Sequence, residues 1–363
     1  MNRAELQAQA ARTLKIDRRL ICQWATGVGK SRVVLNFLKD NPECSCLILV
    51  PEQNNIDNWV GEFVKYNVPL SSVTIMCYAS LHKLENTKWD LLVFDEAPHI
   101  DTEKRLRICR SLSGKYVLAL GAVISDDERY ALESTYGRFT KSVITLKSAI
   151  DNEILPVPRI NVCHIQLNHS LRTFWYCGRK LTAAEMYKVY QEKVDSTKAV
   201  YDQSPTESNK QKMLRVGLQR KRFLALMKEN AVKYICNGLQ GKNRRFLCFC
   251  NSINQAENLC KERAFTSKTA KSEHLLEKFN NKEINSLFVV GKLIEGQNLV
   301  DIEHGVIAQL GGTERITVQA VGRIMRSKNP VIWIPVIDGT KDDQYLWSIT
   351  SNIQDSYISH YNL

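Results

Sequence analysis

Residues 19–31 read RLICQWATGVGKS: a short apolar run, then a glycine-rich segment that ends in lysine and serine. The apolar run at 19–24 predicts a β-strand, and residues 30–39 predict a helix. Between a strand and a helix, such a loop can surround phosphate oxygens with backbone N–H groups, aided by the positive end of the helix dipole. The stretch therefore predicts an α/β unit with a phosphate site after its first strand.

Each residue of this loop has an expected part in binding a nucleotide. Lys30 is expected to reach the β- and γ-phosphates, and the Ser31 hydroxyl to ligate Mg²⁺. Trp24 stands where the full phosphate-loop pattern has its first glycine. An ordinary glycine turn is the alternative, and the spacing Gly-x-Gly-Lys-Ser argues against it. The predicted nucleotide-binding residues of the loop are Thr26, Gly27, Val28, Gly29, Lys30 and Ser31.

Apolar runs alternate with helical patterns in two parts of the chain. Runs of this length suit strands covered on both faces, as in a parallel sheet wrapped by helices. Further strands are predicted at 46–50, 73–76, 90–94 and 116–120, and, in the second part, at 246–250, 286–290, 305–309 and 331–336. The fold class is therefore α/β with two parallel-sheet units.

A segment of different character separates the two units. Prolines 156 and 158 exclude helix and indicate an extended connector. Residues 180–235 are polar and helical, with a capping box at 182–185. From 210 to 222 six residues are basic and none is acidic, so the helix around Arg220 could lie along a phosphate backbone or be a solvated linker face. The predicted domains are residues 1–150, a connector and helical insertion at 151–240, and residues 241–363.

Composition favours a cytosolic protein with a polyanionic partner. The 363 residues include 50 Lys+Arg against 38 Asp+Glu, a formal charge of +12. Such an excess suits nucleic acid, although a basic soluble protein is the alternative. The 11 scattered cysteines indicate buried free thiols and no metal site. No signal peptide and no apolar run of about 20 residues is present, so a cytoplasmic protein without a membrane partner is expected.

Two further segments can complete a nucleotide site. The predicted strand at 90–94 ends in Asp95 and Glu96, which suits a Mg²⁺-holding aspartate and a glutamate that polarises the attacking water. In the second unit, Gln319, Arg323 and Arg326 recur at helical spacing on one face. Such a face can present two guanidinium groups to a γ-phosphate as arginine fingers, although a basic surface helix is the alternative.

These motifs together resemble those of the superfamily-two helicases, the DEAD/DEAH-like motors, from about residue 6 to residue 337. The resemblance implies two RecA-like lobes that hold one ATP with Mg²⁺. It implies an adenine-reading role for Gln7 and a contact with the nucleotide sugar, or a relay between sites, for Asn298. Residues 49–51 with Trp59 are similar to a motif that touches the nucleic-acid backbone in the family. Residues 78–81 resemble a stretch that often follows it.

Two departures concern the coupling of ATP to movement. Pro98 stands where the family usually has His or Asp, with His99 one position later. Residues 121–123 read Gly-Ala-Val in place of the family's Ser-Ala-Thr or Thr-Ala-Thr. His99 either compensates from its shifted position or caps the following helix, and both alternatives stay open.

The predicted function is an ATP-dependent DNA helicase or translocase. The alternatives are an ATP-switched nucleic-acid clamp with weak turnover and an RNA helicase. A phosphate-loop kinase would leave the second unit and residues 319–326 without a purpose. DNA is preferred because Trp59, residues 78–81 and residues 295–299 look more like restriction-type and phage repair helicases than DEAD-box RNA helicases. The short chain hints at a phage protein, which would work in the cytoplasm of a bacterial host.

Overall fold

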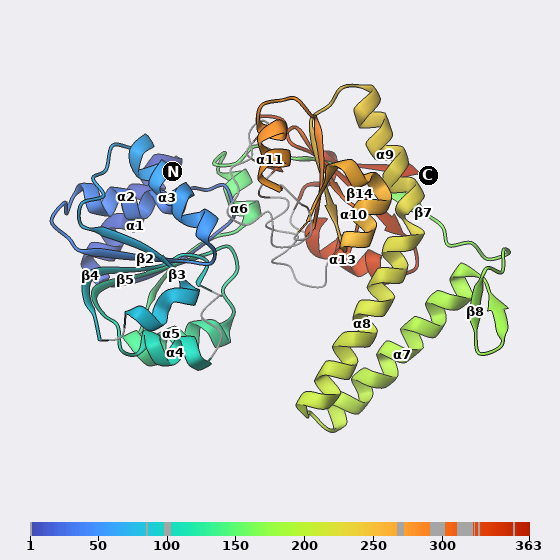
Figure 1. Cartoon of the computed structure of the whole chain (residues 1–363), viewed down its shortest axis with the longest axis horizontal. Helices are drawn as coiled ribbons and strands as arrows, with labels where there is room; N and C mark the ends of the chain where they lie inside the picture. Colours follow the sequence, from blue (N-terminus) through green and yellow to red (C-terminus); the bar gives the residue numbers. More distant parts are fainter. Residues whose placement is uncertain are drawn as a thin grey trace. The chain divides into compact units, whose positions relative to one another are not determined.

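A computed structural model describes residues 2–84, 86–97, 103–266, 272–290, 302–310, 322, 324–325, 327–350 and 353–363. They divide into two compact units, each built on a parallel sheet flanked by helices (Figure 1). Unit 1 contains residues 2–157 and the described residues from 322 to 328, and unit 2 contains the remainder. The predicted α/β class with two parallel-sheet units is confirmed.

Unit 1 has six parallel strands in the order β3-β2-β4-β5-β1-β6. The strands are β1 (Arg19–Trp24), β2 (Cys46–Val50), β3 (Val73–Cys77), β4 (Lys88–Phe94), β5 (Ser113–Gly121) and β6 (Thr140–Ile144). The helices are α1 (Arg3–Asp17), α2 (Ser31–Lys39), α3 (Gln53–Lys65), η1 (Tyr78–Lys83), α4 (Glu103–Cys109), α5 (Asp126–Tyr136) and α6 (Leu146–Asp151). All five residues of β2 are buried, as expected for a strand covered on both faces.

The strand order of unit 1 places its predicted site. Only β5 separates β1 from β4. Because all of these strands run in the same direction, the segments that follow β1, β4 and β5 emerge at one edge of the sheet. These segments are the glycine-rich loop, Asp95 and residues 121–123.

Unit 2 has seven parallel strands in the order β11-β12-β10-β13-β14-β7-β15. The strands are β7 (Arg159–Ile165), β10 (Phe246–Cys250), β11 (Ala264–Phe265), β12 (Ser286–Val290), β13 (His304–Ile307), β14 (Val331–Ile337) and β15 (Ile358–Asn362). The helices are α9 (Glu229–Gly241), α10 (Ile253–Cys260), η3 (Lys261–Arg263), α11 (Ser272–Asn280), α13 (Lys341–Thr350) and η5 (Asp355–Tyr357). Strand β7 comes from the stretch predicted as connector and insertion. The boundaries at 150 and 240 stay a prediction.

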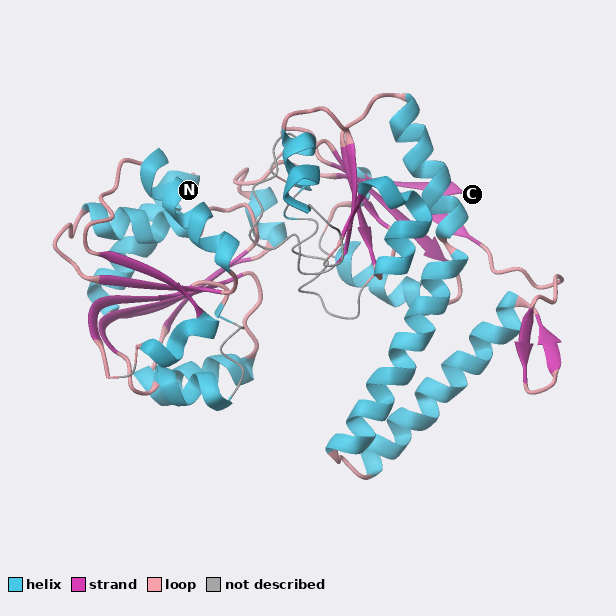
Figure 2. Cartoon of the chain, in the orientation of Figure 1, coloured by secondary structure: helices cyan, strands magenta, loops and turns pink. Residues whose placement is uncertain are grey.

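The predicted helical insertion forms an arm of two long antiparallel helices in unit 2, α7 (Ala183–Gln203) and α8 (Glu207–Met227) (Figure 2). A hairpin of β8 (Phe174–Tyr176) and β9 (Arg179–Leu181) precedes it. The predicted capping box is confirmed, since Thr182 and Glu185 exchange side chain–backbone hydrogen bonds. Arg220 fits neither predicted alternative: it is buried and donates to Gln191 Oε1 at 2.6 Å. A buried helix-to-helix bond withdraws it from both phosphate and solvent.

All eleven cysteines lie in described residues and are free thiols, most of them buried as predicted. None of the helices in the described part of the chain is long and apolar enough to cross a membrane.

Candidate nucleotide site

The glycine-rich loop between β1 and α2 has a backbone that only glycine adopts easily. Gly27 has φ +96° and Gly29 has φ +93°. A Cβ on Gly29 would lie 2.4 Å from Gln7 Nε2, and one on Gly27 would lie 3.2 Å from Leu155 Cδ2. The loop is therefore a backbone cradle that a side chain at either position would distort.

Gln7 on α1 holds this cradle from the side. Its buried amide donates to the carbonyl oxygens of Val28 at 2.9 Å and Gly29 at 3.3 Å. A capping box at Asn2 and Glu5 fixes the start of α1, which positions Gln7 one turn later. The structure thus joins Gln7 to the loop, and its adenine-reading role stays a prediction.

The polar side chains of the loop fit a polyphosphate. Lys30 Nζ donates to the carbonyl oxygen of Trp24 at 3.1 Å, and Ser31 is the first residue of α2. The buried Thr26 Oγ1 has no hydrogen-bond partner within the part of the chain described. An unsatisfied hydroxyl beside a lysine and a glycine cradle provides donors for an anionic ligand.

Trp24, which stands where the phosphate-loop pattern has its first glycine, has a structural role in the core. Its indole is fully buried, and Nε1 donates to Ser142 Oγ of β6 at 2.9 Å. The side chain therefore belongs to the core between β1 and its edge strand, while the backbone carbonyl serves Lys30.

Asp95 is held at the end of β4 by three elements. Its N–H donates to the Leu49 carbonyl of β2 at 2.9 Å. Its Oδ2 accepts from Trp59 Nε1 at 2.8 Å, and its carbonyl oxygen accepts from the Tyr78 hydroxyl at 2.9 Å. Glu96 follows with φ +47°, in the left-handed region. Asp95 and Glu96 thus follow the strand on a sharply turned backbone that is held in place by hydrogen bonds.

The environment of Asp95 disfavours its charge. Burial, and to a smaller extent the charge of Glu96, raise the pKa of the carboxyl to about 6, although the hydrogen bond from Trp59 and the charge of Lys30 oppose this rise. Near neutral pH the group is ionised and available to a metal ion. A destabilised carboxylate at a sheet edge is typical of functional sites.

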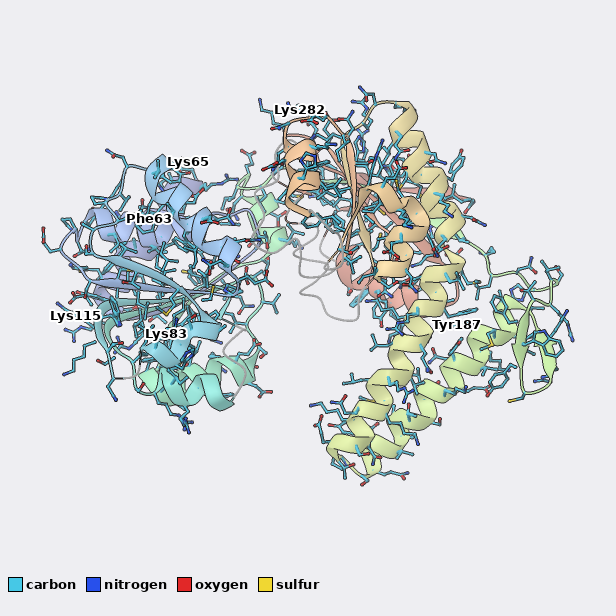
Figure 3. The ribbon with its side chains drawn as sticks, viewed as in Figure 1. Phe63, Lys65, Lys83, Lys115, Tyr187 and Lys282 are labelled. Carbon is cyan, nitrogen blue, oxygen red and sulfur yellow. The ribbon has the colours of Figure 1, made fainter. Side chains whose placement is uncertain are left out.

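Trp59 requires a correction. The family resemblance assigns it to a segment that touches the nucleic-acid backbone, but its side chain is 4% exposed. It packs on Phe63 of α3, with ring centroids 6.2 Å apart, and points to Asp95 (Phe63 is labelled in Figure 3). The indole bridges apolar core and carboxylate, so α3 supports the site from inside. The sequence spacing between Trp59 and Asp95 does not predict this hydrogen bond, because the two residues lie on separate strand–helix crossovers.

The remaining predicted residues are placed only in part. Residue Gly121 ends β5, the strand between β1 and β4, so residues 121–123 adjoin both halves of the site. A Cβ on Gly322 would lie 2.3 Å from Thr26 Cβ, so this glycine of the predicted arginine-finger segment packs on the loop within unit 1. Six predicted residues lie outside the described residues: Pro98, His99, Asn298, Gln319, Arg323 and Arg326.

Comparisons with known proteins agree with this arrangement. The model for the helicase conserved C-terminal domain matches residues 227–328. The chain is similar to the DNA 3'-5' translocase XPB2 of Sulfurisphaera tokodaii, at 23% identity over 353 residues that cover 90% of this chain and 79% of that protein. In fold it is similar to the Pyrococcus furiosus Hef helicase domain, with a TM-score of 0.56, 15% identity, and coverage of 94% of this chain and 97% of that chain. The glycine-rich loop and the Asp95–Glu96 pair on the first sheet, together with the match to the helicase conserved C-terminal domain over residues 227–328, support the resemblance to the superfamily-two helicases.

Proposed function

We propose that the protein is an ATP-dependent DNA helicase or translocase. The observation that carries this proposal is the meeting of a glycine cradle, Lys30 and the metal-suited carboxylate of Asp95 at one edge of a parallel sheet. The similarity to a protein named as a DNA translocase favours DNA as the partner, as does the net charge of +12.

The loop residues have distinct proposed parts. Backbone N–H groups of residues 27–31 and the Lys30 ammonium hold the β- and γ-phosphates. Ser31 and Asp95 hold Mg²⁺, which supplies positive charge beside the transferred phosphoryl group when it is bound. Glu96 orients the attacking water and accepts its proton. Gln7 and Asn298 complete nucleotide binding, and Gln319, Arg323 and Arg326 stabilise negative charge on the γ-phosphate.

A clamp that uses ATP only as a switch is the second candidate. It is favoured by Gly121, which stands where relatives carry a hydroxyl residue between the two halves of the site. Turnover separates the two candidates. If hydrolysis by the wild-type protein stays at background with every DNA and RNA tested, the motor function is refuted and the clamp remains. If RNA stimulates hydrolysis more than DNA does, the choice of DNA is wrong.

Replacement of Lys30 by alanine tests the phosphate-loop assignment. Loss of its ammonium from the γ-phosphate should reduce DNA-stimulated hydrolysis by more than about hundredfold, while DNA binding largely survives. Lys39→Ala is the matched control, because Lys39 lies exposed at the far end of the same helix. The measurement is steady-state phosphate release with and without DNA. Retained turnover in Lys30→Ala would refute the assignment.

Replacement of Arg326 by alanine tests the proposed finger. We expect ATP binding, measured with a fluorescent analogue, to be spared and turnover to be lost, because the guanidinium acts on charge that develops during phosphoryl transfer. Normal turnover in this variant would mean that Arg326 is no finger.

A further inference from the structure

The hairpin at residues 174–181 is a short, tightly turned ribbon. Its two turn residues, Cys177 and Gly178, have φ of +46° and +78°. Positive φ at both positions is the signature of the two-residue turn that matches the twist of paired strands. Trp175 pairs with Lys180 across the ribbon, so these two side chains share one face.

The opposite face fixes the ribbon to the arm. Phe174 packs edge-on against Phe223 of α8, with ring centroids 5.3 Å apart, and Leu181 is buried. The arm is in turn anchored near its start, since Tyr187 of α7 accepts a hydrogen bond from the N–H of Lys341 at 2.8 Å (Tyr187 is labelled in Figure 3). The hairpin is thus held in place by aromatic packing and not only by its own turn.

The free face combines an aromatic ring with positive charge. Trp175 is 70% exposed, and Lys180 Nζ lies 5.6 Å from its ring centroid. Residues 154–184 contain no Asp or Glu, whereas Arg172, Arg179 and Lys180 are exposed on or beside the ribbon. Arg172 has one acidic neighbour, Glu185 at 3.6 Å, in a pair that is largely open to solvent and therefore weak.

We propose that this face of the hairpin binds single-stranded nucleic acid, with a base stacked on Trp175 and a backbone phosphate held by Lys180. Unpaired bases offer their π-faces to an aromatic platform, whereas the bases of a duplex are stacked on one another. The proposal rests on the proposed function and deepens it, because it assigns a contact with single-stranded nucleic acid to the hairpin, which is part of neither parallel sheet.

The test compares two tryptophans of equal exposure. Anisotropy of a labelled oligothymidylate and of a labelled blunt duplex is measured with the full chain and its variants. Trp175→Ala should weaken oligothymidylate binding roughly tenfold and leave duplex binding within about twofold. Trp347→Ala, on α13 and 71% exposed, is the matched control and should change neither. Trp175→Tyr should restore most of the affinity, since a phenol ring also stacks.

The outcomes separate this inference from the function on which it rests. If the wild-type chain binds neither probe, the proposed DNA function fails. If the wild-type chain binds and Trp175→Ala behaves like Trp347→Ala, the hairpin does not bind strands, and its face is left to another partner such as a protein. An equal loss on both probes, or no recovery with Trp175→Tyr, would also overturn stacking on the indole.

Discussion

Each unit of the molecule contains a lysine and an aspartate whose polar atoms are held by hydrogen bonds, and the two sites differ in burial and in whether the two charges pair with each other. In unit 2, Lys228 Nζ and Asp342 Oδ2 are 2.7 Å apart and both side chains are fully buried. Lys228 also donates to the Pro335 carbonyl, and Asp342 accepts from Gln309 and from the Ile337 N–H. The group is closed on itself.

In unit 1, Lys30 and Asp95 are satisfied separately and remain partly exposed. The lysine donates to a backbone carbonyl, and the aspartate accepts from an indole. Among the described residues no carboxylate lies within ion-pair distance of Lys30. A closed pair supports a fold, whereas two half-satisfied charges beside a glycine cradle are available to a ligand. The difference lies in the partners and not in the residue types.

The largest effect on stability is expected from breaking the buried ion pair of Lys228 and Asp342. Lys228→Met should lower the free energy of unfolding by about 3–5 kcal/mol, because it leaves the Asp342 carboxylate buried without a cation. Chemical denaturation of the purified variant measures this. The double variant Lys228→Met/Asp342→Leu should recover most of the loss, since it removes both charges. A single variant as stable as the wild type would mean that the pair is not closed in solution.

The next effect concerns the site of Lys30 and Asp95, called the open site, and the stability that the protein loses by keeping the Asp95 charge there. Asp95→Asn should abolish turnover and yet raise the free energy of unfolding without nucleotide by about 1–3 kcal/mol, because it removes a charge that its surroundings disfavour. Trp59 can still donate to the asparagine oxygen.

The pH dependence of this gain has a definite sign. The pKa of Asp95 is raised from 3.8 to about 6 by burial and by the charge of Glu96. The native carboxyl is therefore a weaker acid than the unfolded one, so the wild type loses stability relative to Asp95→Asn as pH rises from about 4 to about 6. The difference should be absent below that window and constant above it. Thermal melts of both proteins at pH 3.5, 5 and 7.5, values chosen on either side of and within this window, check the sign. A gain that grows toward low pH would contradict the assignment.

The smallest effect tests how the open site is positioned. Trp59→Phe keeps the ring in its core position and removes the N–H that points to Asp95. Loss of a bond to a charged acceptor should lower turnover about tenfold and raise the Mg²⁺ concentration at half-maximal rate. Trp89→Phe is the control, since that indole donates to Thr87 Oγ1 at 3.0 Å, away from the site. Equal rates and equal Mg²⁺ dependence for the two variants would leave Trp59 with a packing role alone.

Local patterns predicted the open site better than the closed one. The loop and Asp95 follow apolar strands directly, and the rule that parallel strands end at one edge brings them together. Trp59 was grouped by resemblance with a motif that touches the nucleic-acid backbone, because nothing local shows that an indole on one crossover reaches a carboxylate on another. Lys228 and Asp342 are 114 residues apart, and no local pattern in the sequence predicts that they pair.

Strand β7 shows that long-range contacts also limit how much of the fold local sequence patterns can predict. Prolines 156 and 158 mark an extended segment, and the residues that follow, Arg159–Ile165, were left in the connector and not predicted as a strand. They become one by pairing with β14 and β15, which lie far along the chain. By contrast, the capping box at Thr182 was predictable, because all of its partners lie within one helical turn.

The turn of the hairpin has a practical consequence for spectroscopy. Of the eleven cysteines, all of which lie in described residues, Cys177 alone is exposed. Burial raises the pKa of thiols such as those of Cys22 and Cys46, which slows their reaction with maleimides. A thiol-reactive dye should therefore label the wild-type protein chiefly beside Trp175, without removal of any other cysteine. Its emission would then follow, in real time, the arrival of a strand at the ribbon.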